Sequence, residues 1–351
     1  MASTWTGGRG PADVAVADVG PPGHTHGVEV HDRAVGCVLG LALGDALGAP
    51  FEFRRAHEIP DPLPAFERPW MGRPPGVTTD DTAMARNLVR SLVARRGFDA
   101  DDLVRRHVEW LASGPPDVGT LTRRVLRRVA DGRPAEEAAR SVWEERGPEV
   151  SGGNGSVMYC APLGVAFAHR PGALFDLAPR LSSVTHVDER CRTAVLAVCL
   201  AVAALVRAEP GRSAVRGALD ATLDRPGGEE LEFLVDAVGG SRPVDGPDQG
   251  FCLFAAAVGL RAVLRAAEGS DAGGGRVERE LRGVVALGGD TDTNAAVAGA
   301  LLGAAAGCSG LPAAWLDRLS DREAIEREAA GLVPLAEEGS DAPGARDDGL
   351  R

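Results

Sequence analysis

The stretch Gly36-Cys37-Val38-Leu39-Gly40-Leu41-Ala42-Leu43-Gly44-Asp45-Ala46-Leu47-Gly48 places a glycine at every fourth position of an otherwise apolar run. Residues four apart lie on one face of a helix, so these glycines predict a helical stripe without side chains. Glycine at this density lowers helix propensity, and close packing in the centre of a bundle is the compensation that we expect. Gly299, Gly303 and Gly307 form a similar stripe near the other end of the chain.

The rest of the chain predicts helices and no clear strands. Apolar periodicity indicates helices near 31–48, 82–97, 99–112, 119–131, 134–146, 188–209, 211–224, 228–238, 250–268, 276–287 and 294–307. Long irregular loops are expected at 49–78 and 147–160. No linker divides the core, so we predict one compact, single-domain all-α fold over residues 29–335, between a disordered leader (1–28) and a disordered acidic tail (336–351).

Composition narrows the class of protein. The chain has 351 residues and a net charge of −12, which argues against non-specific binding to nucleic acid or to an anionic membrane. All 38 basic residues are arginines, so a single arginine is weak evidence for a phosphate site. The six cysteines show no CxxC spacing, and the N-terminal residues show no basic-then-apolar signal pattern. We therefore expect a cytoplasmic protein with reduced thiols and no membrane span.

Two short acidic motifs lie about two hundred residues apart, each at the start of a small-residue helical run. The first is Thr79-Asp80-Asp81-Thr82 and the second is Asp290-Thr291-Asp292-Thr293, which follows two glycines. A helix N-cap explains one residue of the first motif but not two adjacent aspartates between threonines. If the fold brings the motifs together, four carboxylates converge, and their oxygen ligands suit Mg²⁺, Mn²⁺ or Ca²⁺ rather than zinc.

Other candidate residues have ordinary structural explanations when each is considered alone. The loop Gly152-Gly153-Asn154-Gly155-Ser156 could hold a pyrophosphate on its N–H groups or could be an interhelical turn. Asp45 could face a cavity or solvent, and Glu52 could be a solvated loop residue. His186 lies in a segment that could cap a helix, and Asp117 could be a turn residue.

Taken in order, these segments resemble the ADP-ribosylglycohydrolase family. The resemblance covers about residues 31–335 and rests on seven segments: the glycine-striped run 36–48, Glu52, Thr79-Asp80-Asp81-Thr82, Asp117-Val118-Gly119, Gly153-Asn154-Gly155-Ser156-Val157-Met158, Thr185-His186-Val187-Asp188 and Gly288-Gly289-Asp290-Thr291-Asp292-Thr293. The family is that of the dinitrogenase-reductase-activating glycohydrolase and the ADP-ribosyl-acceptor hydrolases. It implies a compact all-α fold with two Mg²⁺ or Mn²⁺ ions in a cleft.

The resemblance also implies a role for each matching residue. The implied metal ligands are Thr79, Asp80, Asp81, Asp290, Asp292 and Thr293, with Asp292 bridging the ions. Glu52 matches a mobile-loop glutamate that takes part in catalysis, together with the metal-bound Asp81 and Asp292. ADP-ribose would be bound by Gly153, Asn154, Gly155 and Ser156 at the diphosphate, by His186 near the ribose or phosphate and by Phe251 at the adenine. Asp117 matches an aspartate that holds the target guanidinium in arginine-directed members.

The expected activity is hydrolysis of the glycosidic bond between ADP-ribose and a modified acceptor, with protein arginine as the expected acceptor. The expected partners are therefore ADP-ribose and an ADP-ribosylated protein. One departure from the family motivates an alternative. Many members follow the Gly-Asn-Gly-Ser motif with Met-Arg, whereas this chain has Met158-Tyr159. The alternative is an ADP-ribose-binding module of the same fold that turns over slowly or not at all.

Overall fold

The computed structural model describes residues 24–223, 229–244, 250–268 and 274–339. The α-helices in this part of the chain are α1 (His24–Gly48), α2 (Asp80–Arg95), α3 (Ala100–Ala112), α4 (Thr120–Ala130), α5 (Ala135–Arg146), α6 (Ala161–Ala166), α7 (Leu174–Ser183), α8 (Glu189–Val206), α9 (Gly211–Leu223), α10 (Glu229–Gly239), α11 (Cys252–Glu268), α12 (Gly274–Val285), α13 (Thr291–Ala306), α14 (Ala313–Leu316), α15 (Arg322–Ala330) and α16 (Val333–Glu337). Short 3₁₀ turns are η1 (Ala49–Phe51), η2 (Ala56–Glu58), η3 (Pro148–Val150), η4 (Pro171–Ala173) and η5 (Cys308–Gly310). The expected all-α fold is confirmed.

The two glycine stripes pack against each other along α1 and α13. A Cβ atom at Gly36 would lie 2.5 Å from the backbone nitrogen of Cys308. Cβ atoms at Gly40 and Gly44 would overlap the carbonyl oxygens of Gly299 and Ala295. The backbones of the two helices therefore touch, which only glycine permits, and the predicted close packing is confirmed. The pairing of these particular stripes is what the structure adds.

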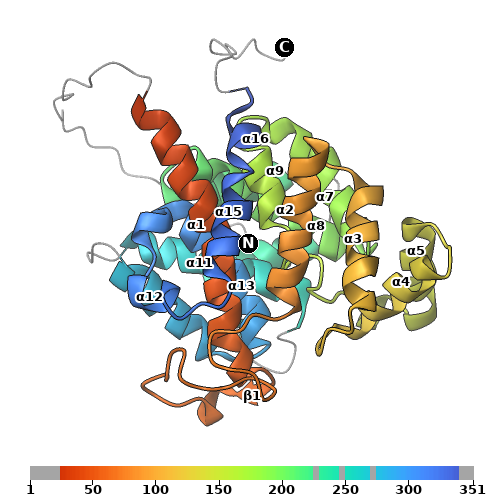
Figure 1. The fold of residues 1–351 in the computed structure, drawn as a ribbon, viewed down its shortest axis with the longest axis horizontal. Coiled ribbons are helices and arrows are strands. Elements are labelled where there is room, and N and C mark those ends of the chain that lie inside the picture. Colours follow the sequence, from red (N-terminus) through yellow and green to blue (C-terminus); the bar gives the residue numbers. More distant parts are fainter. Residues whose placement is uncertain (1–23, 224–228, 245–249, 269–273, 340–351) are drawn as a thin grey trace, which may run out of the picture.

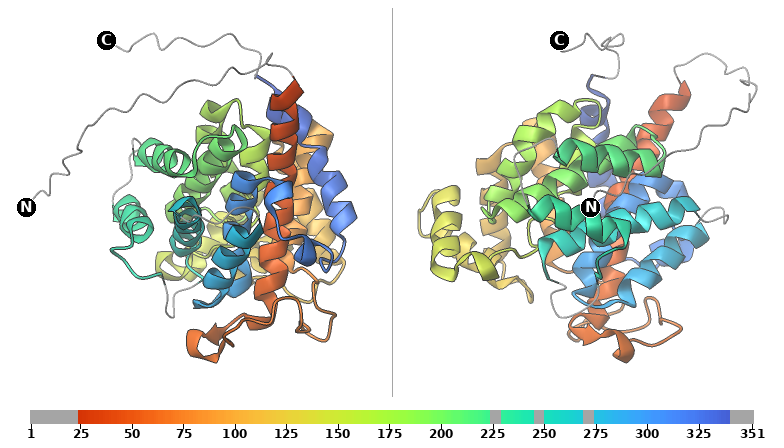
Figure 2. Two further views of the ribbon diagram at one scale, coloured as in Figure 1. Left: turned by 90° about the vertical axis from the view of Figure 1, so that its left-hand side faces the viewer. Right: turned by 180° about the vertical axis from the view of Figure 1, so that it is seen from behind.

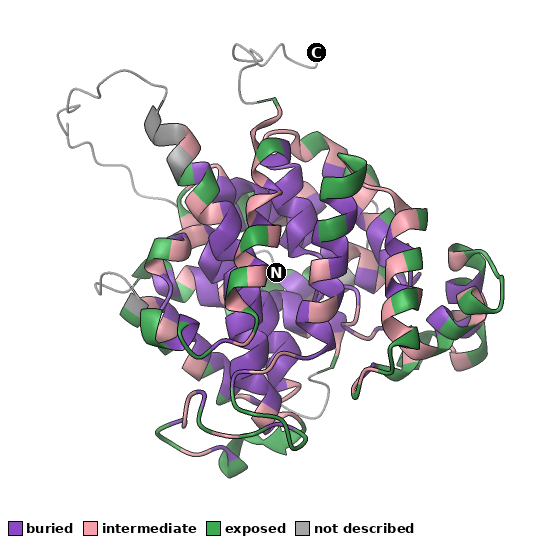
Figure 3. Cartoon of the chain, viewed as in Figure 1, coloured by how far each residue is buried: buried purple, intermediate pink, exposed green. Residues whose placement is uncertain are grey.

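Helix α1 is the central element of the bundle. It runs lengthwise through the molecule, with the loop that carries β1 across one end and α4 and α5 out to the side (Figure 1). Helices α9, α10 and α11 lie on the face seen from behind (Figure 2). Burial is greatest along the middle of the bundle and least on that loop and on α4 and α5 (Figure 3). Segment Glu29–Phe51 is long and apolar enough to cross a membrane, which was not expected from the sequence. However, 94% of its apolar 18-residue stretch is buried inside the protein, as in a core helix.

The structure differs from the sequence-based expectation at several helix ends and in short helices. Helix α1 begins at His24 and α16 ends at Glu337, inside the expected leader and tail, whose remaining residues 1–23 and 340–351 lie outside the described part of the chain. Helices α6, α7, α14, α15 and α16 were not predicted. Helix α7 contains Pro179, and α6, α14 and α16 have only six, four and five residues.

A minimal β-ladder was also not expected. Strand β1 (Arg54–Arg55), in the predicted 49–78 loop, pairs antiparallel with β2 (Gly288–Gly289), with Arg54 opposite Gly289 and Arg55 opposite Gly288. Two residues per strand are too few to give an alternating pattern in the sequence. The ladder ties the loop that carries Glu52 to the turn that precedes the second acidic motif.

Candidate active site

The first acidic motif forms the N-terminus of α2. Thr79 is the N-cap, and its hydroxyl accepts a hydrogen bond from the backbone nitrogen of Asp81 at 3.3 Å. Asp80 and Asp81 follow in the first turn, where the helix dipole favours negative charge. The capping interpretation of this motif is therefore confirmed for Thr79, and it leaves both carboxylates for another task.

Asp45 of α1 holds this helix start from outside. Its carboxylate accepts hydrogen bonds from the backbone nitrogens of Thr79 at 3.0 Å and Thr82 at 3.1 Å, and from the Thr82 hydroxyl at 2.5 Å. The side chain is fully buried. The sequence left open whether Asp45 faces a cavity or solvent, and the structure shows a third role, because it satisfies α2 amides that have no intrahelical partner.

The second acidic motif forms the N-terminus of α13. Gly288 and Gly289 both have φ of 75°, which turns the chain sharply as expected, and Asp290 is the N-cap position of the helix. The Thr291 hydroxyl donates to the carbonyl of Gly48 at 2.8 Å. The turn therefore presents Asp290 and Asp292 beside the C-terminal end of α1.

The two motifs meet in one cavity of about 360 Å³. Its walls include Asp80, Asp81, Asp290, Asp292 and Thr293. Thr293 Oγ1 lies 3.5 Å from Asp81 Oδ2, which joins α13 to α2 directly. The predicted meeting of the motifs is confirmed. Thr79 does not line this cavity, and its hydroxyl instead donates to Asp81 Oδ2 at 3.1 Å.

Carboxylates from two loops complete the acidic group. Carboxylate oxygens of Glu52, Asp117 and Asp292 lie within 4.8 Å of one another. Glu52 follows η1 and is held near the site because Phe53 N donates to Gly289 O at 2.7 Å, beside the β1–β2 ladder. The structure therefore places Glu52 and Asp117 at the cavity, and Glu52 is not merely the solvated loop residue that was its alternative interpretation.

The carboxylates of the cavity are difficult to ionise together. Burial, followed by the nearby charges of Asp117 and Asp290, raises the pKa of Glu52 to about 8. Burial and the charge of Asp117 raise the pKa of Asp80 to about 7. Burial and neighbouring aspartates also raise the pKa values of Asp81 and Asp292 well above the usual value for a carboxyl group. A positive charge placed among them would restore the ionised forms.

The donor set fits divalent cations that prefer oxygen. Every side chain at the meeting point offers a carboxylate or hydroxyl oxygen, which suits Mg²⁺ or Mn²⁺. Asp81 Oδ1 is buried and has no hydrogen-bond partner among the described residues. A buried carboxylate oxygen without a partner is costly unless an ion or water occupies its free side. The acidic group therefore satisfies the requirements of a metal centre.

The glycine-rich loop forms another part of the cavity wall. Gly153, Asn154, Gly155 and His186 line it, and a Cβ atom at Gly155 would lie 2.8 Å from the His186 ring. The Asn154 side chain donates to Asp290 Oδ2 at 2.9 Å, so it orients a site carboxylate. Ser156 differs from expectation: its buried hydroxyl lies 3.0 Å from that of Ser182 and not on the cavity wall. Ser156 would therefore contact a diphosphate only through its backbone N–H group.

The segment around His186 contributes a cavity-lining ring and a helix cap. The His186 ring faces the cavity, and its Nδ1 lies 2.8 Å from the Thr185 hydroxyl. Burial lowers its pKa to about 4, so the ring is neutral near pH 7. Asp188 caps α8 by accepting from the backbone nitrogen of Arg190 at 3.1 Å, which confirms the capping interpretation for that residue.

Phe251 lies in an adjoining hollow of about 490 Å³ and not in the acidic cavity itself. Gly153 lines both spaces, and a bridge between Gly153 and Phe251 joins them, with Asn154 N donating to Gly250 O at 3.1 Å. The ring packs edge-on against Phe233, with centroids 5.4 Å apart, and Arg190 lies over it at 5.6 Å. The expected aromatic therefore lies next to the glycine-rich loop.

Tyr159 lies in the protein core and away from the cavity. Its side chain is fully buried and packs edge-on against His107, with ring centroids 5.2 Å apart. Met158, the preceding residue, lines the cavity instead. The replacement of the family's arginine by tyrosine therefore changes the core behind the glycine-rich loop.

The comparison with known proteins settles the family. The ADP-ribosylglycohydrolase family model matches residues 27–342. The chain belongs to the ADP-ribosylglycohydrolase family. It is 31% identical over 317 residues to the ADP-ribosyl-(dinitrogen reductase) glycohydrolase of Rhodospirillum rubrum, covering 88% of this chain and 98% of that relative. It is 30% identical over 323 residues to the ADP-ribosylarginine hydrolase Tri1 of Pseudomonas putida strain GB-1, covering 87% of this chain and 79% of Tri1.

A solved structure agrees with this assignment. A chain described as an ADP-ribosylglycohydrolase-related protein complex superposes with a TM-score of 0.71 at 33% identity, covering 88% of this chain and 99% of that one. The family resemblance inferred from seven sequence segments is therefore confirmed. As a member of this ADP-ribosylglycohydrolase family, the protein is a hydrolase of ADP-ribose linkages.

The raised pKa values predict how the stability of the metal-free protein depends on pH. A carboxyl whose folded pKa is raised stabilises the fold below its unfolded pKa of about 4, and this stability is lost as the pH rises through the folded pKa. The folded pKa is about 8 for Glu52 and about 7 for Asp80, so the stability that each group contributes is lost as the pH rises through these values. We expect the Tm of EDTA-treated protein to fall between pH 5 and pH 8.5, and Mg²⁺ to reduce the fall. A Tm that rises over this range without metal would contradict the electrostatic account.

Proposed function

We propose that this protein is a metal-dependent hydrolase that removes ADP-ribose from arginine side chains of modified proteins. The observation that carries the proposal is the convergence of both acidic motifs, Glu52 and Asp117 on one cavity. Two Mg²⁺ or Mn²⁺ ions would be held by Asp80, Asp81, Asp290, Asp292 and Thr293, with Thr79 acting through its hydrogen bond to Asp81. When bound, such ions orient ribose hydroxyls and lower the pKa of water.

The chain's own residues supply binding and proton transfer. The bare backbone at Gly153 and Gly155 offers N–H groups to a diphosphate at the wall of the same cavity. The pKa of Glu52 is raised to about 8 without metal, so Glu52 would act as a base only when a nearby cation restores its carboxylate. That carboxylate would then take a proton from the attacking water. Loss of the acceptor passes through an oxocarbenium-like state at the anomeric carbon, which the surrounding carboxylates stabilise electrostatically.

Asp117 supports arginine as the acceptor. Its carboxylate is half-buried, and burial raises its pKa, so pairing with a cation would favour its ionised form. A guanidinium is permanently charged and offers a planar fork of donors to a carboxylate. The name of one relative, ADP-ribosylarginine hydrolase Tri1, agrees with this acceptor.

The expected cytoplasmic location stays a prediction.

The direct test is release of ADP-ribose from an arginine-ADP-ribosylated protein, with and without Mg²⁺, beside a serine-linked substrate. We expect release from the arginine-linked protein in Mg²⁺ and little after EDTA treatment. Release only from the serine-linked substrate would show that the acceptor is serine and not arginine. No release from either substrate would refute the proposed hydrolase activity. Tight ADP-ribose binding without release would instead support the binding module, although Tyr159, which motivated that alternative, lies outside the cavity.

Replacing Glu52 separates catalysis from binding. In Glu52→Gln we expect turnover to fall by about 10² to 10⁴-fold, because the proton acceptor is lost while the shape of the side chain is kept. Affinity for ADP-ribose, measured by calorimetry, should change much less. Glu58→Gln is the matched control, because Glu58 lies on the same loop, is exposed and does not line the cavity. A larger loss of binding than of turnover would show that Glu52 is not the proton acceptor.

A further inference from the structure

A second pocket lies on the outer side of Asp80 and Asp117. It encloses about 270 Å³, and these two carboxylates also line the acidic cavity, so the two spaces share a wall. Of these two spaces, the glycine-rich loop lines the acidic cavity and not the second pocket. A substrate with its diphosphate on that loop and its anomeric carbon among the carboxylates would extend its acceptor into the second pocket. We call this space the acceptor pocket, with walls formed by Trp70, Arg73, Thr78, Thr79, Asp80, Ala83, Arg86, Trp110, Ser113, Gly114, Pro115, Pro116 and Asp117.

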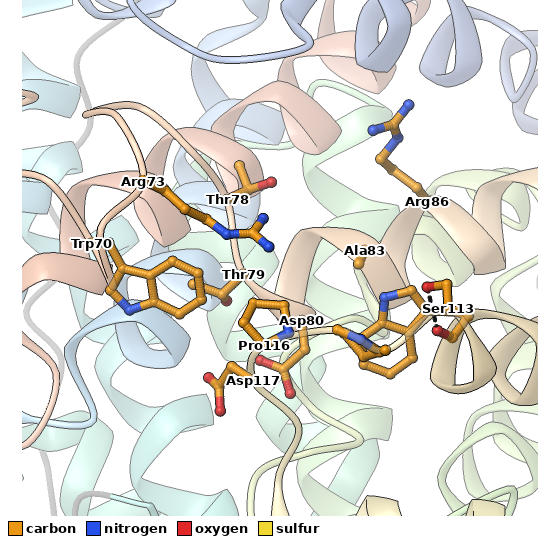
Figure 4. Close-up of a pocket in the computed structure, with 13 residues that line it drawn as sticks. Trp70, Arg73, Thr78, Thr79, Asp80, Ala83, Arg86, Ser113, Pro116 and Asp117 are labelled. Carbon is orange, nitrogen blue, oxygen red and sulfur yellow. Dashed lines mark hydrogen bonds between the residues drawn. The ribbon is translucent and has the colours of Figure 1, made fainter.

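The acceptor pocket combines flat apolar walls with acidic groups at its base. Trp70 is 6% exposed, and Trp110 is half-buried. In Figure 4, the carboxylates of Asp80 and Asp117 lie between Trp70 on one side and Ser113 on the other. Indole rings and carboxylates are the surroundings that a guanidinium prefers, through stacking and charge pairing.

A tight turn places an arginine beside Trp70 at this pocket. Trp70 N donates to Arg73 O at 3.2 Å, and Arg73 N donates to Trp70 O at 2.8 Å. The two central residues have positive φ, 46° at Met71 and 74° at Gly72, as in a type I′ hairpin turn. Residues directly opposite in such a pair share one face, so the side chains of Trp70 and Arg73 lie together. Figure 4 shows the Arg73 guanidinium above the site carboxylates.

Arg73 and Arg86 differ in their partners. Arg86 pairs with Glu328 at 3.0 Å and with Asp321 at 3.1 Å, so its charge is already compensated. Arg73 is exposed, and no carboxylate within the described residues forms an ion pair with it. The acceptor pocket therefore has two carboxylates and one cation, Arg73, that has no ion-pair partner in the described part of the chain.

We infer that the acceptor pocket receives the modified arginine of a protein segment and that Arg73 selects segments with an Asp or Glu next to that arginine. The inference rests on the proposed function, because it assumes an ADP-ribosylated arginine at the anomeric position. The base of the pocket pairs with the guanidinium, and Arg73 pairs with the neighbouring carboxylate. A neighbouring Lys would instead be repelled by Arg73, so the pocket discriminates by sequence as well as by linkage.

Matched peptides test this inference. Three peptides would carry one ADP-ribosylarginine flanked by Glu, Ala or Lys, and free ADP-ribosylarginine would serve as the substrate without neighbours. We expect kcat/KM to follow Glu, Ala, Lys in falling order, with about a fivefold step for one partly exposed charge pair. The difference should appear in KM, because Arg73 contacts a part of the substrate that does not react.

Charge reversal gives the decisive comparison. Arg73→Glu should reverse the order to Lys over Glu when kcat/KM for each peptide is divided by the value of the same variant on free ADP-ribosylarginine. Arg127→Glu is the control, because Arg127 is equally exposed, lies on α4 and does not line either pocket. Equal rates on all three peptides, or an order that Arg73→Glu does not alter, would overturn the inference. Failure to cleave even free ADP-ribosylarginine would instead refute the proposed function.

Discussion

Asp81→Asn is expected to lower ADP-ribose release by about a thousandfold or more while raising the stability of the metal-free protein. Asp81 lies at the junction of both acidic motifs. One of its carboxylate oxygens accepts from Thr79, and the other is buried with no hydrogen-bond partner in the described part of the chain. Asparagine keeps the shape but removes the negative charge that would hold a cation. Loss of charge stabilisation by a bound ion amounts to several kcal/mol, of which about 4 kcal/mol corresponds to a thousandfold in rate.

The opposite effect on stability has the same cause. The pKa of Asp81 is raised well above the usual value by burial and then by Asp45 and Asp80, so its ionised form destabilises the metal-free fold at neutral pH. In Asp81→Asn, we expect a higher Tm in EDTA and a smaller rise of Tm on adding Mg²⁺. Asp101→Asn, on the exposed start of α3, should change neither activity nor the Mg²⁺ effect.

Two results would contradict this account. Full activity in Asp81→Asn would show that the acidic motifs do not form the catalytic centre. If Asp81→Asn lost activity as expected but had a lower Tm in EDTA than the unchanged protein, the charge of Asp81 would stabilise the fold. That result would contradict the electrostatics described for the cavity.

Gly44→Ala is expected to destabilise the protein by about 3 kcal/mol or more, which is a large effect for one methyl group. A Cβ atom at Gly44 would lie 2.8 Å from the backbone nitrogen of Ala296 and would overlap the carbonyl of Ala295. Backbone atoms of α13 cannot rotate away as a side chain can. The two central helices must separate, which also moves Asp290 and Asp292 at the start of α13.

Gly217→Ala is the matched control for this prediction. Gly217 lies on α9 with no atom near its would-be Cβ, so alanine should stabilise that helix by about 0.5–1 kcal/mol. The midpoints of urea unfolding would give both values. A Gly44→Ala protein as stable as the Gly217→Ala protein would show that α1 and α13 can separate without cost. Activity per folded molecule should fall only in Gly44→Ala.

Much of the candidate site could be predicted from the sequence because its residues are contiguous in short motifs. Thr79 to Thr82 and Asp290 to Thr293 each provide their own cap, acidic turn and helix start, so local chemistry identified them. The same holds for the glycine stripes, whose spacing of four indicates a helix face. Residues whose role depends on a distant partner were missed or misplaced: Asp45 caps another helix, and the Ser156 hydroxyl bonds Ser182.

The sequence alone determined the helical class, the close-packing stripes and the family, because these follow from periodicity and from local motifs. Only the tertiary structure decided that the two stripes pack together, and this packing sets the acidic motifs side by side. It also decided that Glu52 and Asp117 lie at the cavity and that Trp70 and Arg73 line a second pocket next to it. Loop positions depend on pairing with segments more than two hundred residues away, as in the β1–β2 ladder, and no local pattern encodes that pairing.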